Sequence, residues 1–354
     1  MVMFSHLAVL AVVAASTWQP QNSPAACVEI QSMLIDSGGR LNAPLSYTAA
    51  LQAADQCVAS RGNHDDYILR GYVHEGMRQY ELAESDYSNA VRLHPGAASH
   101  YSRGVNRRLL GRYVDSIADI REAMRLGFVN PAQAHVEIAI SLRALGKFDD
   151  ALSETVAALT LQPSNRSAYI EQRHIYAEQE RWDEVVGVAT RLIAADPSSA
   201  EAYNYRGQGL LELGRLDAAL SDFDRAVSLN NRFPDAHSNR GSLLMDMGRF
   251  REAVEAYERA ISFDGSNRIY WANLCLAQSH ADEQRRALSA CDRAYELSET
   301  NVQRATVLSI RGLISERLGQ SGSAEAYYRD SLRLGAEGRS LTRVQDGLRR
   351  LGVS

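Results

Sequence analysis

Lysine is almost absent from this sequence of 354 residues: Lys147 is the only one, and arginine supplies the other basic side chains of fixed charge. Acidic residues outnumber basic ones by 43 to 38, which gives a formal net charge of −5. A chain with this balance has no overall positive field that would attract nucleic acid or an anionic membrane. We therefore expect no nucleic-acid partner.

The motifs that mark catalytic and metal sites are also missing. The sequence has no Gly-x-Ser-x-Gly elbow, no Walker loop and no Cys-x-x-Cys pair. The segment HEGMR at 74–78 begins like the zinc motif HExxH, but the second histidine is absent. We expect no enzyme, no cofactor, no metal site and no small-molecule substrate.

One apolar run stands out, LAVLAVVAA at residues 7–15. It is too short to span a bilayer and has the length of the apolar core of a secretory signal. We interpret residues 1–23 as a signal peptide and leader, which predicts export to a bacterial periplasm and no stable transmembrane segment after processing. The alternatives are a cytoplasmic chain with a mis-assigned start and a retained anchor, because no lysine or arginine precedes the run.

The glycines of RGQGLLELGR (206–215) do not have the spacing of a dinucleotide-binding loop. Similar segments recur instead as RGVNRRLLGR (103–112), RGSLLMDMGR (240–249) and RGLISERLGQ (311–320). These segments mark a repeat with a period close to 34 residues. Units of two helices each are predicted to begin near His64, Ala97, Ala132, Arg166, Ala200, Pro234, Arg268 and Ala305.

Small residues recur inside these units at fixed places. The first helix carries one in mid-course, and the second helix carries two that lie seven residues apart and so share one helical face. They are Gly71, Gly104, Ala139, Gly207, Gly241 and Gly312 in the first helices, and Ala83/Ala90, Ala151/Ala158, Ala219/Ala226 and Ala253/Ala260 in the second.

With its turns GRY, GKF, GRL and GRF and the aromatic residues Tyr87, Phe223 and Tyr257, this pattern resembles the tetratricopeptide repeat over residues 64–338. The resemblance implies an all-α fold, a right-handed α-solenoid of about eight helix pairs. Residues 24–63 are expected to form an irregular N-terminal helix pair, and 339–354 a C-terminal capping helix. In the capping helix, Arg339, Arg343, Arg349 and Arg350 are expected to form a solvated face.

The unit at 166–199 departs from the pattern. Arg173, Val185 and Leu192 replace small residues there, and Glu180 stands where the other units have a turn glycine. We expect this unit to be the weakest point of the array, because bulky residues keep neighbouring helices apart.

Each pair of cysteines is symmetric about a turn. Cys27 and Cys57 lie equally far from residue 42, and Cys275 and Cys291 equally far from residue 283. Residues placed in this way face each other in a helical hairpin, so we predict the disulfides Cys27–Cys57 and Cys275–Cys291, which agree with export. The alternative is that the cysteines stay free and serve as small core residues.

The resemblance further implies that a protein or peptide partner binds in a concave groove lined by the first helices. Counting within each unit gives an apolar half flanked by arginines, with Tyr72 and Tyr101 as aromatic anchors, and an acidic half. The apolar half contains Ile68, Tyr72, Tyr101, Val105, Arg108, Leu109, Val136, Ile140, Arg143 and Ile170, and the acidic half contains Glu178, Glu201, Asn204, Gln208, Glu212, Asp235 and Asp246.

Three functions remain open from the sequence. The first is a non-catalytic scaffold that holds a partner segment in the groove. The second is a structural adaptor subunit of an envelope machine for secretion, polysaccharide export or cell-wall remodelling. The third is a cytoplasmic regulator of the same repeat type. There is also an alternative to a binding groove. In it, the apolar residues of the set are half-buried between neighbouring helices, and the acidic residues only keep the rim solvated.

Overall fold

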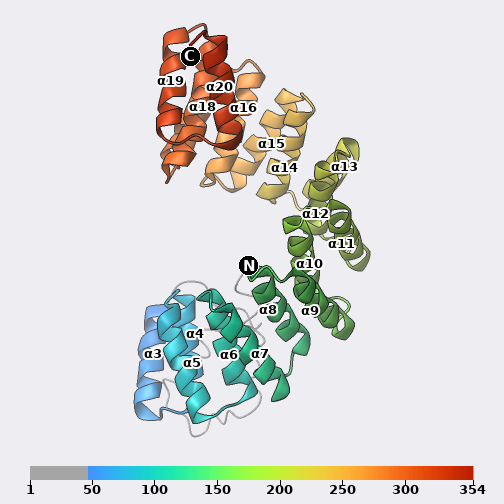
Figure 1. Cartoon of the computed structure of the whole chain (residues 1–354), viewed down its shortest axis with the longest axis vertical. Coiled ribbons are helices and arrows are strands. Elements are labelled where there is room, and N and C mark those ends of the chain that lie inside the picture. Colours follow the sequence, from blue (N-terminus) through green and yellow to red (C-terminus); the bar gives the residue numbers. More distant parts are fainter. Residues whose placement is uncertain (1–46, 354) are drawn as a thin grey trace. The chain divides into compact units, whose positions relative to one another are not determined.

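The computed structural model describes residues 47–353, so the predicted leader, Cys27 and most of the N-terminal helix pair lie outside the described residues. The chain divides into two compact units, Met1–Gln179 (unit 1) and Glu180–Ser354 (unit 2). Every regular element in the described residues is an α-helix, which confirms the predicted all-α fold (Figure 1).

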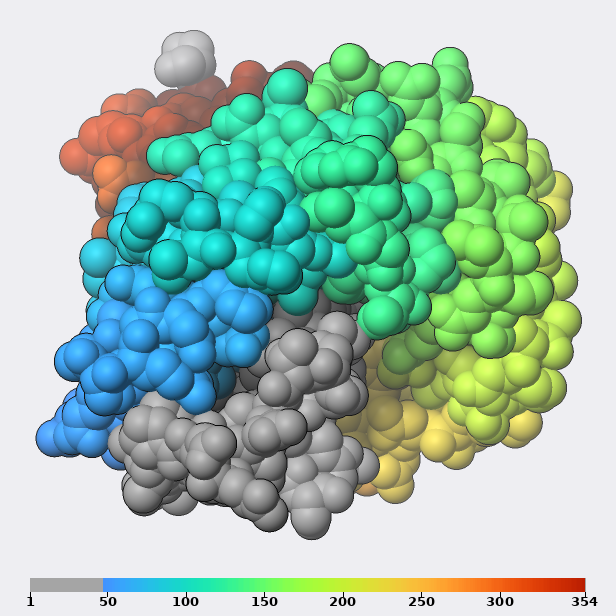
Figure 2. Space-filling view, turned by 90° about the horizontal axis from the view of Figure 1, so that it is seen from below, coloured from blue at the N-terminus to red at the C-terminus, as the bar shows by residue number. Residues whose placement is uncertain are grey.

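Helices follow one another at short intervals in both units. Those of unit 1 are α3 (Tyr47–Ser60), α4 (His64–Gly76), α5 (Tyr80–Leu93), α6 (Ala97–Leu109), α7 (Tyr113–Arg125), α8 (Pro131–Ala144), α9 (Phe148–Leu161) and α10 (Arg166–Glu178). Those of unit 2 are α11 (Trp182–Ala195), α12 (Ala200–Glu212), α13 (Leu216–Leu229), α14 (Pro234–Asp246), α15 (Phe250–Phe263), α16 (Arg268–His280), α17 (Gln284–Glu296), α18 (Asn301–Arg317), α19 (Ser321–Arg333) and α20 (Gly338–Arg350). The space-filling view shows α3 to α7, coloured blue to blue-green, packed in chain order (Figure 2).

Consecutive helices pack as hairpins, and each hairpin packs against the next one along its unit. In each hairpin we call the earlier helix the first helix and the later one the second helix. The last helix, α20, has no second helix and packs against α18 and α19. Its Val344, with Leu348 and Leu351, covers Tyr328 of α19, as expected of a capping helix.

Local sequence signals determine where the helices begin and end. The side chain of Asn63 accepts a hydrogen bond from the backbone N–H of Asp66 at 3.0 Å, which caps the start of α4. At the end of α6, Gly111 takes φ = 75°, a left-handed conformation that glycine adopts without a Cβ penalty. There the N–H of Gly111 bonds to the carbonyl oxygen of Arg108, and that of Arg112 to the carbonyl oxygen of Arg107, a Schellman turn.

Inside the hairpins, a glycine of the first helix lies under a ring of the second helix. A Cβ added at Gly71 would come within 2.7 Å of the ring of Tyr87, and one at Gly207 within 2.7 Å of Phe223. The same contact joins Gly241 to Tyr257. The two residues are 16 positions apart in each case. The small residues of the first helices are therefore required by close packing of the hairpin.

The arginine before Gly71 and the one before Gly207 each bind an aspartate on the second helix of the same hairpin, also 16 positions away. Arg70 donates to both carboxylate oxygens of Asp86, at 3.0 and 2.6 Å, and Arg206 does the same to Asp222, at 2.7 and 2.8 Å. In α6 and α7, Arg103 pairs with Asp119. Two hydrogen bonds in parallel fix the rotation of one helix against the other.

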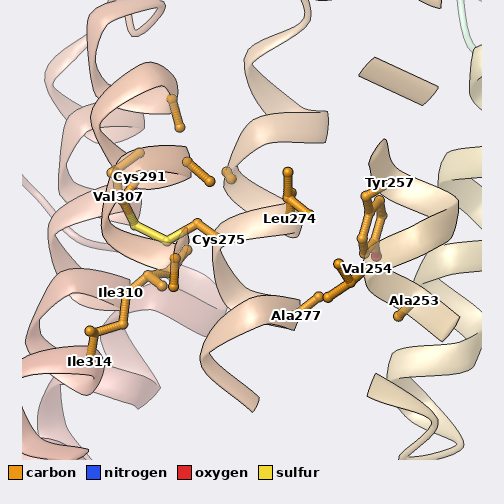
Figure 3. Packing of buried hydrophobic residues seen from close by; sticks show 14 of the residues in the cluster. Ala253, Val254, Tyr257, Leu274, Cys275, Ala277, Cys291, Val307, Ile310 and Ile314 are labelled. Atoms are coloured by element: carbon orange, nitrogen blue, oxygen red, sulfur yellow. A yellow bond between two sulfur atoms is a disulfide. The ribbon is translucent and has the colours of Figure 1, made fainter. Parts of the chain in front are cut away.

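A disulfide takes the place of the glycine–ring contact in the hairpin α16–α17. Cys275 and Cys291, again 16 positions apart, are bonded, with their Cα atoms 5.2 Å apart. Both are fully buried within a cluster that includes Leu274, Val307 and Ile310 (Figure 3). The bond joins the two cysteines that lie equally far from the turn, as the sequence predicts. Cys57 is buried as well, and no cysteine in the described residues is a free thiol.

The division between the two units falls inside the atypical repeat 166–199. Unit 1 ends at Gln179, after α10, and unit 2 begins at Glu180, before α11. Glu180 takes φ = 55°, in the turn position where other repeats have glycine. In unit 2, Val185 and Val186 of α11 pack close to Gly209 of α12. The bulky side chains of α11 thus belong to the packing of unit 2.

Arg78 offers a test of the turn geometry, because it holds the left-handed position between α4 and α5 with φ = 59° and is exposed. A Cβ in this conformation is strained, so Arg78→Gly should raise the free energy of unfolding by about 0.5–1 kcal/mol. Gly111→Ala at the equivalent turn should lower it by about 1 kcal/mol. Urea unfolding followed by circular dichroism measures both, and shifts of the same sign would contradict the assignment.

Removal of the disulfide should weaken unit 2. The bond closes a loop of 16 residues, for which the chain-entropy estimate gives about 3 kcal/mol. The variant Cys275→Ala/Cys291→Ala should lose stability of this order in denaturant unfolding. Treating it with reductant should not change the stability of its α16–α17 hairpin further, whereas reductant should weaken this hairpin in the unsubstituted chain. Equal protection of α16 and α17 from hydrogen exchange in the variant and in the unsubstituted chain, both measured without reductant, would contradict the prediction.

Candidate functional site

First helices form a continuous layer in each unit. In unit 1, contacts join α4 to α6, α6 to α8 and α8 to α10, and in unit 2 they join α12, α14, α16, α18 and α20 in the same way. No comparable contact joins consecutive second helices among the described residues. Each unit is therefore narrower on the side of its first helices, and we call the outer surface of that layer the first-helix face of the unit.

On the first-helix face of unit 1, most of the predicted apolar groove residues are buried. Tyr101 is 0% exposed and its ring stacks on Phe128 with centroids 4.1 Å apart, and Tyr72 is 6% exposed. Leu109 and Ile140 are half-buried. The buried members of the set are Ile68, Tyr72, Tyr101, Val105, Val136 and Ile170.

The expectation of two aromatic anchors is corrected accordingly. Burial raises the pKa of both Tyr72 and Tyr101, so the rings are neutral members of the core. Neither ring is available to a partner, because neighbouring helices cover them. Replacing both with alanine would leave cavities in unit 1 and would not report on binding.

The two groove arginines of unit 1 are neutralised by glutamates from the next first helix. Arg108 Nε donates to Glu137 at 2.8 Å, and Arg143 Nε donates to Glu171 at 2.6 Å. Arg143 also pairs with the exposed Glu178. The sequence analysis missed Glu137 and Glu171, although the two arginine–glutamate spacings, 29 and 28 residues, are nearly equal.

Both glutamates are buried at their ion pairs. Burial raises the pKa of Glu171, but hydrogen bonds from His174 and Arg143 outweigh that effect and lower the pKa below its usual value. Glu137 is 1% exposed and also accepts a hydrogen bond from Gln133 at 3.0 Å. The ion pairs connect successive first helices and leave little uncompensated charge on the first-helix face of unit 1.

The first-helix face of unit 2 differs, because part of its predicted acidic set is open. Glu212 of α12 and Asp246 of α14 are exposed and have neither a hydrogen bond nor an ion pair with the described residues. By contrast Asp235 accepts a hydrogen bond from the hydroxyl of Tyr270.

The remaining predicted members of this set are less accessible. Asn204 is buried, and its Oδ1 accepts a hydrogen bond from Asn239 at 2.9 Å. Glu201 and Gln208 are half-buried. Of the acidic half, Glu212 and Asp246 are therefore the two carboxylates that a partner can reach without breaking an existing contact.

The row that contains Glu212 and Asp246 continues on the next two first helices as His280 and Arg317. All four residues stand near the C-terminal end of their helix, at intervals of 34, 34 and 37 residues. The charge along this row changes from negative on α12 and α14 to positive on α18. Arg317 was not among the predicted groove residues, because only the packing of α18 beside α16 brings it into the row.

In the residues that the structure describes, no group of three or more histidine, cysteine, aspartate or glutamate side chains could hold a metal ion. None of the described helices combines the length and apolarity that a membrane span requires.

Family models match the chain in three places. Two models described as tetratricopeptide repeat match residues 68–127 and 234–267, and one described as TPR repeat matches residues 207–248. The chain contains tetratricopeptide repeats over residues 68–127 and 207–267. Repeats of this type bind proteins or peptides, so the first-helix faces are the natural candidates for a site. No curated protein matches the chain.

Solved structures of tetratricopeptide repeat proteins are similar to this one. A tetratricopeptide repeat protein from Parabacteroides merdae is 18% identical with a TM-score of 0.53, and the match covers 72% of this chain and 98% of that one. MamA from Desulfovibrio magneticus is 18% identical with a TM-score of 0.42, covering 48% and 96%. YrrB, described as having an unusual peptide-binding site, is 20% identical with a TM-score of 0.40, covering 52% and 95%. The first of these agrees with the fold.

The ion pair between Arg108 and Glu137 gives a test of the structural role of this face in unit 1. Arg108→Met should lower the free energy of unfolding by about 3–5 kcal/mol, since it leaves the Glu137 carboxylate buried without a cation. Arg108→Met/Glu137→Met should recover most of the loss, because neither charge then remains. A double-mutant cycle in urea measures the coupling, and additive losses would contradict the ion pair.

Proposed function

We propose that this tetratricopeptide repeat protein is a non-catalytic scaffold that holds a segment of a partner protein on the first-helix face of unit 2. The observation that carries the proposal is the pair of exposed, unpaired carboxylates at Glu212 and Asp246. The equivalent face of unit 1 supports a structural role instead, since its rings are buried and its arginines are paired.

The chemistry of the open carboxylates suggests what the segment carries. Lysine or arginine side chains that approach Glu212 and Asp246 would gain charge-assisted hydrogen bonds without disrupting the scaffold. Exposed charges of one sign also select partners by electrostatic complementarity and speed their association. We therefore propose a partner segment with a basic stretch at α12 and α14.

A structural adaptor in an envelope machine is the second candidate. It is favoured by apolar side chains of unit 1 that are more than half exposed on or beside the second helices. They are Leu82, Val114, Val129, Val156 and Leu161. An apolar surface of this kind fits a permanent interface better than transient capture of a peptide. A stable complex of fixed stoichiometry, lost when Val114 and Val156 are changed to glutamate, would favour this function.

We also propose that the protein acts in an oxidising compartment such as the bacterial periplasm. The apolar run at 7–15 and the disulfide between Cys275 and Cys291 support this location. N-terminal sequencing of the protein purified from cells tests it. A retained Met1, together with free thiols at Cys275 and Cys291, would favour the cytoplasmic regulator instead.

Peptide display tests the proposed binding face. A random peptide library selected on the purified full chain should yield binders rich in lysine and arginine. Reversing both charges in Glu212→Arg/Asp246→Arg should weaken these binders by about tenfold or more, because two ionic contacts become repulsive. Fluorescence anisotropy with labelled peptides measures the affinities.

The matched control reverses two charges on the second helices of the same two repeats, in Asp217→Arg/Glu255→Arg. Both control residues are exposed. Binding should be retained there. An equal loss in the two double variants would mean that only overall charge matters, and the absence of any selected binder would contradict a peptide-binding face in unit 2.

A further inference from the structure

The positive end of the row in unit 2 is a cluster of cationic and polar side chains on three adjacent first helices, α16, α18 and α20. Arg317 donates to the carbonyl oxygen of Ser279 and to Nδ1 of His280, the latter at 3.2 Å. Arg343 donates to Oγ of Ser309 at 2.7 Å. We call His280, Arg317, Arg343 and the exposed Arg339 the cationic cluster.

The members of the cationic cluster are close enough to affect one another. Burial, followed by the charges of Arg317 and Arg343, lowers the pKa of His280. Burial and the charge of Arg339 likewise disfavour the charged form of Arg343 and lower its pKa. The expectation of a solvated face is thus wrong for Arg343, which lies mostly inside the cap.

Neither Arg343, which is half-buried, nor Arg317, which is exposed, forms an ion pair with a carboxylate of the described residues, in contrast to several half-buried arginines of other first helices. Elsewhere Arg70, Arg103, Arg108, Arg143 and Arg206 each meet a buried aspartate or glutamate at 3.0 Å or less. In the cationic cluster, Arg317 and Arg343 have only neutral partners among the described residues. Two carboxylates lie near the cluster: Asp282 raises the pKa of His280, and the charge of Arg317 helps to lower the pKa of Glu316. Glu316 is paired with Arg350, and neither carboxylate forms an ion pair with Arg317 or Arg343 among the described residues.

An arginine without a counter-ion attracts an anion, whether it is half-buried, as Arg343 is, or exposed, as Arg317 is. Its guanidinium carries five N–H donors in a planar fork, and such a fork matches the two oxygens of a carboxylate. Arg317 donates hydrogen bonds from two of its nitrogens, and Arg343 from one. Both arginines therefore retain N–H groups for a ligand.

We propose that the cationic cluster is a binding site for the carboxylates of an acidic peptide segment, formed by Arg317 and Arg343 with Arg339 at its rim. This inference rests on the proposed function and extends it. The partner segment would carry a basic stretch at α12 and α14 and an acidic stretch at α16 to α20. The reversal of sign along the row Glu212, Asp246, His280 and Arg317 would then fix the direction of the partner along unit 2.

The probe is hexaglutamate with an acetylated N-terminus and an amidated C-terminus, so that all its carboxylates are side chains. Anisotropy of the labelled probe on the full chain at low ionic strength should show saturable binding. Arg317→Gln/Arg343→Gln should weaken it by about tenfold or more, since two charge-assisted contacts are lost. The control Arg329→Gln/Arg333→Gln removes two exposed arginines of α19 that pair with Glu325 and Asp330, and it should bind as the unsubstituted chain does.

A second variant removes the site without removing an arginine. Ser309→Asp places a carboxylate beside Arg343 and should weaken hexaglutamate binding while it retains the helical signal. Unchanged binding in both Arg317→Gln/Arg343→Gln and Ser309→Asp would overturn the proposal. Binding of inorganic phosphate without any binding of hexaglutamate would also overturn it, in favour of a small anion.

Failure of this inference is distinguishable from failure of the proposed function. Glu212→Arg/Asp246→Arg should keep or strengthen hexaglutamate binding, because the cationic cluster is intact in it. If basic peptides bind the chain and hexaglutamate does not, the proposed scaffold function is supported and the proposed anion site at the cationic cluster is refuted. If hexaglutamate binds through Arg317 and Arg343 while no basic peptide binds, the anion site stands and the contact at Glu212 and Asp246 falls.

Discussion

The contact on which each repeat depends is the one between the middle of the first helix and the residue 16 positions later on the second. Where Gly71 meets Tyr87, or Gly241 meets Tyr257, the ring occupies the space that a Cβ would need. This contact sets the distance between the two helices and leaves their remaining faces to pack against the neighbouring repeats. The close approach is available only to glycine, because any larger residue would push the ring out of the core.

Different chemistry can serve the same constraint. The hairpin α16–α17 uses a covalent bond between Cys275 and Cys291 where other repeats use a glycine and a ring. The repeat at 166–199 has Arg173 at the glycine position and a left-handed Glu180 in its turn, and the chain divides into its two compact units at that turn. Repeats of one length therefore differ in how firmly their two helices are held together, since an array of this type is stabilised repeat by repeat.

Charge is used differently in the two units. In unit 1 the arginines on the first-helix face are bound by buried glutamates, as in Arg108–Glu137. These ion pairs hold successive first helices in a fixed alignment. In unit 2, Glu212 and Asp246 lie open, and Arg317 and Arg343 meet only neutral groups. Positions that are equivalent in the repeat can thus serve packing in one unit and remain free for recognition in the other.

The sequence by itself determined the helix pairs, their turns and the pairing of Cys275 with Cys291, because these features depend on helical periodicity and on residues close along the chain. Only the tertiary structure decided that Tyr101 is covered by Phe128 and that Arg108 is neutralised by Glu137, 29 positions away. The same holds for Arg343, which is drawn into the cap without a counter-ion. Whether a side chain on the first helix faces a partner or a neighbour depends on how successive repeats rotate against each other, and that rotation is set by packing between repeats rather than by any local spacing.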